Sequence, residues 1–485
     1  MAKSVTNNII AKGTLDIFNT LLPFILVPYV YRILGRDCIG NIEYMMTLFS
    51  YFGILGLLGT YNYGIRSISS NRNDLAKIKD TYKNLFSIGI ISNLFFFICY
   101  LLFVRYFISD PAIKVIGYIY SGNLLAQALN VEWFNEAFEE FRFITIKTMV
   151  IRLISVAAIF TLVRTPEDAI IYVFILSIVC ILNYLVSFCY AQHRIGLSFR
   201  ETFQHLHMRD FIAPLLIILV LKNTGVLYTI ADRTMLGHYT GTANVGLFSI
   251  GQKIVEIAKT LVLSVVFATL PRLALYLKED KELYISGLHK IIRLLVALLF
   301  PVGIGLFLLS DQVILLIGGE EYIGAVPAMR IFSLRIIFLG IESIIYNQVL
   351  FLHGKERVIL KYNLFCGLLN VALNFMLLNI LSPFTAILST WICEIIFESL
   401  CILYIKRNLK FNLGLFNKAN CRYLILSLLF APIVLGIKHL PLSELSQLAV
   451  SICICASLYI GTLYFLKDKT LYEILLRFHI IKNLP

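Results

Sequence analysis

The sequence predicts an all-α polytopic membrane protein with about fourteen transmembrane helices. Apolar runs of about twenty residues, the length of a helix that crosses the bilayer core, recur along the whole chain. Hydrophobic residues make up 59% of the 485 positions, charged residues make up 15%, and the mean hydropathy is +0.83. This composition leaves no room for a sizeable soluble domain. The hydrophilic breaks are alternately rich and poor in Lys and Arg, as expected when every second break faces the cytoplasm.

The apolar runs define the predicted helices in chain order. The first six spans are Ile9–Leu34, Ile42–Tyr63, Leu85–Phe107, Ile113–Asn135, Ile144–Val163 and Ala169–Tyr190. The next six are Phe211–Met235, Val245–Leu270, Ile291–Ile317, Ala325–Leu352, Val358–Leu381 and Phe384–Ile405. Two final spans are Tyr423–Ile437 and Leu448–Phe465. All should be helical, because a bilayer core tolerates no unpaired backbone groups.

Basic residues orient these spans. They concentrate in every second break, at 66–83, 194–209, 272–290, 355–361 and 406–418, and again in the tail after 466. Opposing connections such as 318–324 contain none. Both termini are therefore predicted to be cytoplasmic. The formal net charge of +13 is then explained by membrane orientation and anionic lipid headgroups, so no nucleic-acid partner is expected.

Two short motifs occupy corresponding places in the two groups of six spans. Arg32-Ile33-Leu34-Gly35 is followed by Gly40 and Tyr44, and Arg233-Thr234-Met235-Leu236-Gly237 is followed by Gly246 and Phe248. The pattern favours internal duplication, which is common in transporters, although chance glycines at helix ends are the alternative. We expect an N-terminal six-helix lobe at 1–192, a cytoplasmic amphipathic linker at 193–210, a C-terminal six-helix lobe at 211–408, and two additional helices with a basic tail at 409–485.

Charged side chains inside the predicted spans are the main functional candidates, because a charge in the bilayer core is costly and usually faces a polar interior. The cationic candidates for binding a substrate are Arg152, Lys222, Arg233, Lys253, Lys259 and Arg335. The candidates for ion coupling or gating are Lys12, Asp16, Asp232, Glu256 and Glu342. An interior with more cations than carboxylates suits an anionic substrate. The alternatives are an internal Lys12–Asp16 pair and arginines that extend to a membrane interface.

Several activities lack their motifs. The chain has no Gly-rich loop followed by Lys-Ser or Lys-Thr, no nucleophile elbow and no zinc-binding helix motif, so no enzymatic activity and no cofactor are expected. The cysteines and the three histidines between 193 and 207 lack metal-ligand spacing, so no metal site is expected. An ion gradient or the membrane potential would supply energy. The glutamates of segment 132–140 are expected to lie at a solvated helix end.

Five segments in a fixed order carry a resemblance to a known family. They are Arg32 to Gly35 with Gly40, Gly59 to Arg66, Glu132 to Phe134 with Phe141 to Ile144, Asp232 to Gly237, and Val245 to Phe248. With them, nearly the whole chain resembles the polysaccharide (O-antigen or capsule, Wzx-type) flippases of the multidrug/oligosaccharidyl-lipid/polysaccharide (MOP) exporter superfamily. The resemblance implies two pseudo-symmetric six-helix lobes around a central cavity lined by cations, to which Arg66 would also contribute.

The resemblance also implies a function. The protein would move undecaprenyl-pyrophosphate-linked oligosaccharide repeat units from the inner to the outer leaflet of the bacterial cytoplasmic membrane by alternating access. It would act as a monomer, because one chain supplies both lobes, and glycan polymerase machinery is a possible partner. The alternative is a cation-coupled multidrug or metabolite exporter of the MATE type, in which Asp16 would be central and the two last helices unnecessary. A membrane glycan polymerase would need a large outer loop that this sequence lacks.

Overall fold

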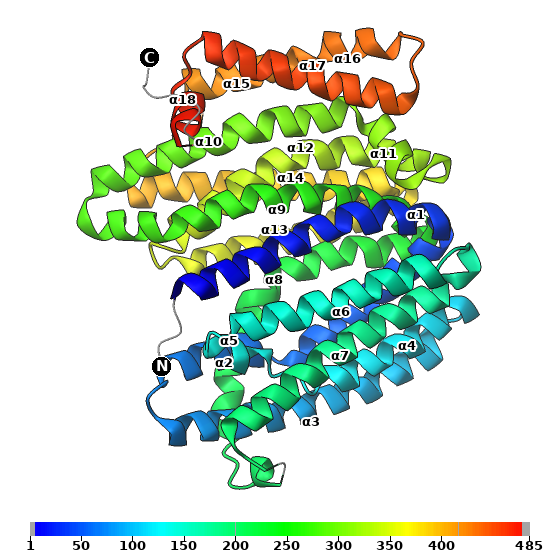
Figure 1. Cartoon of the computed structure of the whole chain (residues 1–485), viewed down its shortest axis with the longest axis vertical. Helices are drawn as coiled ribbons and strands as arrows, with labels where there is room; N and C mark the ends of the chain where they lie inside the picture. The colour runs from blue at the N-terminus through cyan, green and yellow to red at the C-terminus, as the bar shows by residue number, and fades with distance from the viewer. Residues whose placement is uncertain (1–4, 199, 416, 478–485) are drawn as a thin grey trace. The chain divides into compact units, whose positions relative to one another are not determined.

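The computed structural model describes residues 5–198, 200–415 and 417–477, and these ranges contain helices and no strand. The predicted all-α fold class is confirmed. The chain forms two compact units, Met1–Gly246 and Leu247–Pro485. Each unit has its own set of packed helices, coloured from blue to green and from green to red in Figure 1.

The first unit is built on its long N-terminal helix. Its elements are α1 (Val5–Leu57), α2 (Thr60–Ser70), α3 (Leu75–Phe107), α4 (Pro111–Gln127), α5 (Glu132–Ala137), α6 (Phe141–Leu162), η1 (Pro166–Asp168), α7 (Ala169–Ile195), η2 (Glu201–Phe203) and α8 (Arg209–Thr240). α1 packs against α3, α4, α6 and α8, and α4 and α6 each pack against α7. An aromatic core around Tyr82, Phe86, Trp133 and Phe134 joins α3 to α5.

α1 contains the first predicted span and most of the second in one element of 53 residues that is broken at Gly35, and the last residues of the second span, up to Tyr63, belong to α2. The backbone of Gly35 has φ 71° and ψ 172°, a conformation that glycine adopts readily because it has no Cβ. Pro23 and Pro28 lie inside the first arm, where each removes one backbone hydrogen bond. The two arms correspond to the two predicted spans, and the Arg32 to Gly35 motif marks the break between them.

The two sequence motifs contact each other inside the first unit. A Cβ built on Gly40 of α1 would overlap the carbonyl oxygen of Thr242, four residues before Gly246 at the start of α9 (Thr242–Glu279). A Cβ on Gly246 would overlap the carbonyl oxygen of Arg36, four residues before Gly40. The contact is reciprocal, as between two identical surfaces, and a duplicated segment would produce this arrangement. Both glycines therefore have a packing role that a larger residue could not fill.

The fourth span is shorter than predicted. We expected a helix from Ile113 to Asn135, but α4 ends at Gln127, and a turn separates it from α5. The buried Gln127 amide donates to the Gly53 carbonyl oxygen at 2.7 Å and to Asn93 Oδ1 at 3.1 Å. Hydropathy could not show this end, because the polar contacts that hold it come from α1 and α3.

The predicted linker at 193–210 contains several separate pieces. α7 continues to Ile195, η2 forms one short turn, and α8 begins at Arg209. At the start of η2, Glu201 Oε2 accepts hydrogen bonds from the backbone N–H and the hydroxyl of Ser198 at 2.7 and 2.8 Å. These bonds lower the pKa of the Glu201 carboxyl. Position 199 lies outside the described residues. The predicted lobe boundaries stay a prediction.

The second unit contains the rest of the helices. After α9 come α10 (Lys281–Leu308), α11 (Ser310–Gly318), η3 (Glu320–Ala325), α12 (Val326–Ser343), η4 (Ile344–Leu350), α13 (Glu356–Met376), η5 (Leu378–Ile380), α14 (Pro383–Tyr404), η6 (Ile405–Leu409), α15 (Lys418–Leu428), α16 (Phe430–Lys438), α17 (Glu444–Phe465) and α18 (Lys469–Arg477). α10 packs against α12 and α15, and α14 packs against α12 and α13. η4 and η6 are π-helical continuations of α12 and α14.

Nine helical segments of the described chain are long and apolar enough to cross a membrane. One of these, Ala11–Ser70, includes both arms of α1. α12, which has three charged residues among its 18, is not among the nine, and neither is the 17-residue α4. Parts of α8 and α9 lie outside the described residues that this count covers. The multi-pass architecture is therefore clear, while the total of about fourteen crossings stays a prediction.

Candidate functional site

A group of charged side chains lies inside the second unit, where α9, α12 and α14 supply them. Arg335 of α12 is buried, and its guanidinium forms a bidentate pair with Glu394 of α14. Nε donates to Glu394 Oε2 at 2.7 Å, and Nη2 donates to Glu394 Oε1 at 2.5 Å. Paired donors in this fork geometry form one of the strongest side-chain interactions in proteins.

Further charges surround this pair. Glu398 lies one turn beyond Glu394 on α14, is buried, and has an Oε1 without a hydrogen-bond partner in the described part of the chain. Glu342 of α12 is partly buried, and the charges of Glu394, Lys259 and Arg335 act on it. We call these five residues the Arg335 cluster. Three carboxylates and two cations are thus gathered among helices of the predicted membrane region.

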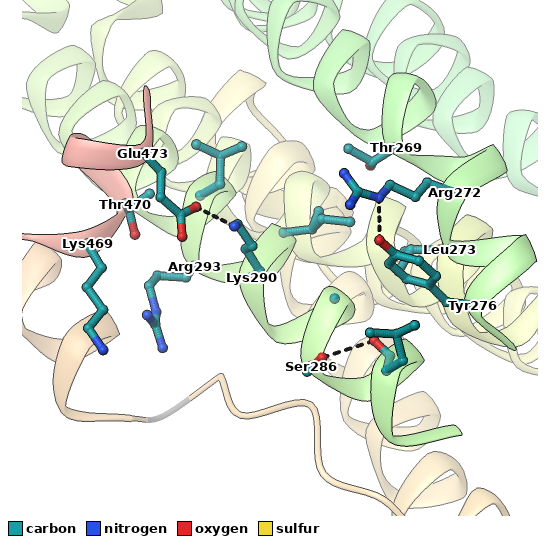
Figure 2. Close-up of a pocket in the computed structure, with 14 residues that line it drawn as sticks. Thr269, Arg272, Leu273, Tyr276, Ser286, Lys290, Arg293, Lys469, Thr470 and Glu473 are labelled. Carbon is teal, nitrogen blue, oxygen red and sulfur yellow. Dashed lines mark hydrogen bonds and ion pairs between the residues drawn. The ribbon is translucent and has the colours of Figure 1, made fainter. Parts of the chain in front are cut away.

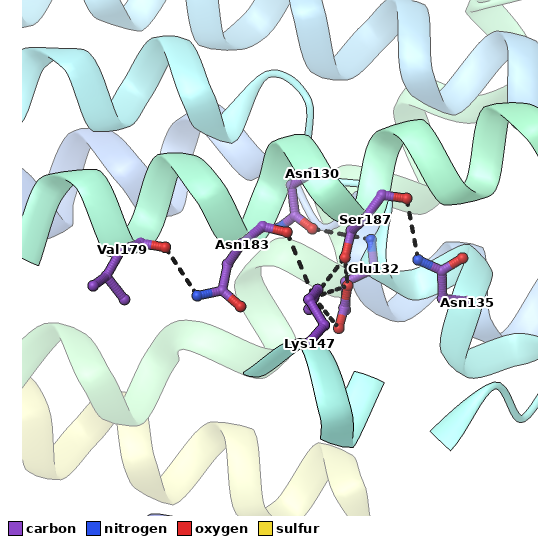
Figure 3. Close-up of polar contacts among 7 residues, drawn as sticks. All are labelled: Asn130, Glu132, Asn135, Lys147, Val179, Asn183 and Ser187. Carbon is purple, nitrogen blue, oxygen red and sulfur yellow. Dashed lines mark hydrogen bonds and ion pairs between the residues drawn. The ribbon is translucent and has the colours of Figure 1, made fainter. Parts of the chain in front are cut away.

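A second group of polar residues lies inside the first unit, among α5, α6 and α7 (Figure 3). Lys147 of α6 is buried, and its Nζ donates to Glu132 Oε2 at 2.9 Å, to Glu132 Oε1 at 3.0 Å and to Ser187 Oγ at 2.6 Å. The Ser187 hydroxyl in turn donates to Glu132. We call these three residues the Lys147 cluster. One cation and one carboxylate neutralise each other in it.

The expectation that the glutamates of segment 132–140 lie at a solvated helix end is wrong for Glu132 and Glu140. Glu140 is 2% exposed, pairs with Arg194 of α7 and accepts a hydrogen bond from Tyr190 Oη at 3.1 Å. Glu139 is partly buried, with its side chain 42% exposed, and pairs with Arg72 at 2.7 Å. The difference arises because α6 and α7 bring their polar residues onto α5 and the segment after it, which a one-dimensional hydropathy profile does not contain.

A further ion pair joins α8 to α1. Arg233 Nη1 lies 2.9 Å from Glu43 Oε2, and both side chains are largely buried. The neighbouring Asp232 is also buried. Arg233 therefore does not sit exposed at an outer boundary, and it has a carboxylate partner in this conformation.

The remaining predicted residues are dispersed over several helices. Lys12 and Asp16 are exposed on the first arm of α1, where the Lys12 Nζ lies 5.5 Å from the centre of the Phe141 ring. Arg66 is exposed on α2, and Arg152 is partly buried on α6. Lys222 belongs to α8, but its side chain lies outside the described part of the structure.

The predicted residues of α9 differ in exposure. Lys253 and Lys259 are partly buried, whereas Glu256 is exposed and accepts a hydrogen bond from Gln252 at 2.7 Å. The structure therefore brings Lys259, Arg335 and Glu342 of the predicted set together in the Arg335 cluster. Whether any predicted residue binds the substrate or couples an ion stays a prediction.

Sequence reasoning missed five charged or polar residues of these contacts. They are Glu43, Lys147, Ser187, Glu394 and Glu398. All lie inside predicted spans. For the four charged ones, the signal that singled out Arg335, a charge within an apolar run, would also have found them.

Comparison with known proteins gives the family. A family model described as "Polysaccharide biosynthesis protein" matches residues 5–276, more than half of the chain. A "Putative O-antigen transporter" of Escherichia coli (strain K12) is 21% identical over 409 residues, which cover 84% of this chain and 97% of that protein. A "Putative O-antigen transporter" of Shigella dysenteriae is 24% identical over 400 residues, covering 78% and 94% of the two chains.

Solved structures share the fold. The lipid II flippase MurJ in an inward closed conformation has a TM-score of 0.76 at 14% identity and covers 98% of this chain and 100% of that chain. An inward-facing MATE family transporter of the MOP superfamily has a TM-score of 0.55 at 13% identity and covers 79% of this chain and 97% of that chain. The named relatives are transporters and flippases, not enzymes. With its helices, its buried charges and this match, the chain belongs to the polysaccharide biosynthesis protein family.

Proposed function

We propose that this protein moves undecaprenyl-pyrophosphate-linked oligosaccharide units from the inner to the outer leaflet of the bacterial cytoplasmic membrane by alternating access. The observation that carries the proposal is the match, over nearly their full length, to two relatives named as O-antigen transporters. The substrate fits the physical requirements of the reaction. Its pyrophosphate needs cations and its sugars need polar surface, while its lipid tail can stay in the bilayer.

Cations within the helices support an anionic substrate. Lys253 and Lys259 lie seven and thirteen residues after Gly246 on α9 and are partly buried, so both are held near the interior of their unit. Lys259 and Arg335 are accompanied by three carboxylates in the Arg335 cluster. Charged side chains held among membrane helices mark the path that a charged headgroup would take.

The helix geometry supports a conformational cycle. α12 passes directly into the π-helix η4 immediately after Glu342 and Ser343, and α14 passes into the π-helix η6. Such widened turns are rare and occur often at functional sites, because they leave backbone groups that can change partners. Alternating access requires helices that can bend at defined places.

The MATE-type exporter is the second candidate, favoured by the fold shared with a solved MATE transporter. The MurJ structure nevertheless covers 98% of this chain, against 79% and 82% for two MATE structures. The flippase hypothesis therefore accounts for more of the chain. Export of a dye from vesicles that contain no lipid-linked glycan would favour the exporter.

The test is glycan export in a strain that lacks its own flippase and carries the matching glycan pathway. Lys253→Ala with Lys259→Ala should stop export while the protein still inserts, because two cations of the proposed substrate path are lost. The matched control is Lys278→Ala with Lys281→Ala, which removes the same charge from exposed positions. Lipid-linked units should accumulate in the inner leaflet.

Two results would contradict this proposal. Normal export by a well-inserted Lys253→Ala, Lys259→Ala variant would show that these lysines do not bind the substrate. Accumulation of unpolymerised units in the outer leaflet, in cells without the protein, would point to a polymerase instead of a flippase.

A further inference from the structure

A pocket of about 290 Å³ lies in the second unit, where the C-terminal part of α9, the N-terminal half of α10 and the short helix α18 meet (Figure 2). We call it the tail pocket. It is distinct from the Arg335 cluster, none of whose residues line it. Neither the family match nor the proposed flippase function assigns a role to this pocket.

The charge of the tail pocket is strongly unbalanced. Among the described residues that line it, one is acidic, Glu473, and four are cationic: Arg272, Lys290, Arg293 and Lys469. Lys290 Nζ pairs with a Glu473 oxygen at 2.6 Å. Arg272 Nε donates to the neutral Tyr276 hydroxyl at 2.5 Å. Three cations are therefore left without a carboxylate of the pocket to neutralise them.

The Arg293 side chain in the tail pocket has a hydrogen-bond donor without an acceptor among the described residues. Its Nε is buried and has no hydrogen-bond partner in the described part of the chain. Figure 2 shows its guanidinium and the Lys469 ammonium extending in the same direction from α10 and α18. A buried guanidinium N–H without an acceptor is costly, so this position favours an anionic oxygen from another molecule.

The wall formed by α18 is fixed in place. The Asp468 carboxylate before α18 pairs with Arg422 and accepts a hydrogen bond from the Tyr423 hydroxyl at 2.9 Å. The ring of Tyr472 in α18 also stacks on the ring of Tyr464 in α17, with the ring centres 5.4 Å apart. The pocket is thus built by folded elements, and the position of Lys469 and Glu473 follows from these contacts.

The pocket also has an apolar part and a predicted membrane side. Leu273, Ile291 and Leu294 line it beside the cations. The segment from 272 to 290 and the tail after 466 are both basic, and the charge pattern predicts the same cytoplasmic side for both. Cations next to apolar surface at a membrane interface suit a headgroup whose acyl chains remain in the bilayer.

We propose that the tail pocket binds the phosphodiester headgroup of an anionic phospholipid from the cytoplasmic leaflet. A phosphate oxygen takes the place of the Glu473 carboxylate beside Lys290, and Arg293 and Lys469 bind the other oxygens. The ligand chemistry is a phosphate anion, and the apolar lining selects a lipid over a free phosphate ion. Binding would tie the C-terminal tail to the lipid composition of the inner leaflet.

The test measures lipid binding by the full chain in neutral detergent, by native mass spectrometry and by the rise in melting temperature. The probes are a short-chain phosphatidylglycerol, a phosphatidylcholine of the same chain length, and inorganic phosphate. The wild type should bind phosphatidylglycerol in preference to the other two. Arg293→Gln with Lys469→Gln should weaken this binding by about 30-fold, because each cation near the headgroup contributes roughly one tenfold step or slightly less.

Two further variants make the result independent of folding defects. Lys278→Gln with Lys281→Gln removes the same charge outside the pocket and should change binding by less than about twofold. Glu473→Gln frees Lys290 and should strengthen binding, which a misfolded protein could not do.

Three results would overturn the proposal. Equal binding of phosphatidylglycerol and phosphatidylcholine would exclude a headgroup site. An equal effect of inorganic phosphate would identify a free anion as the ligand. Unchanged phosphatidylglycerol binding by Glu473→Gln and by the Arg293→Gln, Lys469→Gln variant would place the lipid elsewhere.

Discussion

The Lys147 cluster and the Arg335 cluster are both buried groups of charges between helices, yet their charge balance differs. In the first unit, Lys147 has one carboxylate partner, Glu132, and one hydroxyl, so the charges cancel. In the second unit, Arg335 has a bidentate partner in Glu394, and two more carboxylates lie nearby. The first arrangement links α5, α6 and α7 through side-chain hydrogen bonds, as expected of a structural contact. The second contains more carboxyl groups than cations.

This difference indicates which cluster should be sensitive to a single change. A balanced pair that also has a hydroxyl can lose one member and leave the other with a partner. In the Arg335 cluster, Arg335 pairs with Glu394 and also acts on Glu342, so its removal affects more than one carboxyl group. The predictions below test this difference from the largest expected effect to the smallest.

Arg335→Met should produce the largest loss of stability. It leaves Glu394 buried without its bidentate donor, which should lower the free energy of unfolding by about 3–5 kcal/mol. Unfolding in mixed detergent micelles, followed by tryptophan fluorescence, measures the change. The double variant Arg335→Met, Glu394→Met should recover most of the loss. A double variant as unstable as the single one would show that the ion pair is not the cause.

Lys147→Met should have a smaller effect in the same assay. Glu132 loses its cation but keeps the Ser187 hydroxyl, and its side chain is 17% exposed to solvent. We expect the free energy of unfolding to fall by about 2 kcal/mol. A loss equal to that of Arg335→Met would remove the proposed distinction between the clusters.

Glu398→Gln tests whether the excess carboxylate contributes to stability at all. Because Glu398 Oε1 is buried without a partner among the described residues, replacing its carboxyl group with an amide should leave the free energy of unfolding unchanged or raise it by up to about 1 kcal/mol. Glu394→Gln, one turn earlier on the same helix, is the matched control and should be clearly destabilising. Equal destabilisation by both would mean that Glu398 also has an essential contact.

Arg72→Ala measures how much a solvent-exposed ion pair contributes to the free energy of unfolding, for comparison with the buried pairs. Arg72 and Glu139 are each 42% exposed, and such pairs contribute little because water and salt screen them. The free energy of unfolding should change by less than about 0.5 kcal/mol. A loss of 2 kcal/mol or more, as for a buried pair, would show that this pair is shielded from solvent.

Hydropathy and charge pattern predicted the fold class and most helices, because each helix in a membrane must be apolar along its own length. They could not predict which charges meet. Arg335 and Glu342 share a helix face, as expected from their spacing, but the partner of Arg335 is Glu394, 59 positions away on another helix. Lys147 finds Ser187 in the same way, 40 positions away. Such pairings depend on the packing of helices, which periodicity along one helix does not contain.

The same reasoning explains the early end of α4. Gln127 lies within an apolar run, so the sequence favours a continuing helix, whereas the structure places its amide against the Gly53 carbonyl of α1. A polar side chain in an apolar run is ambiguous until its partner is known.

The contact between Gly40 and Gly246 has a consequence for the history of the chain. Each glycine meets the backbone next to the other, so one kind of surface suffices to build both sides. A shorter ancestor carrying a single Arg36–Gly40 segment could make the same contact between two separate molecules. Gene fusion would then have joined a homodimer into one polypeptide without the need to invent a new interface.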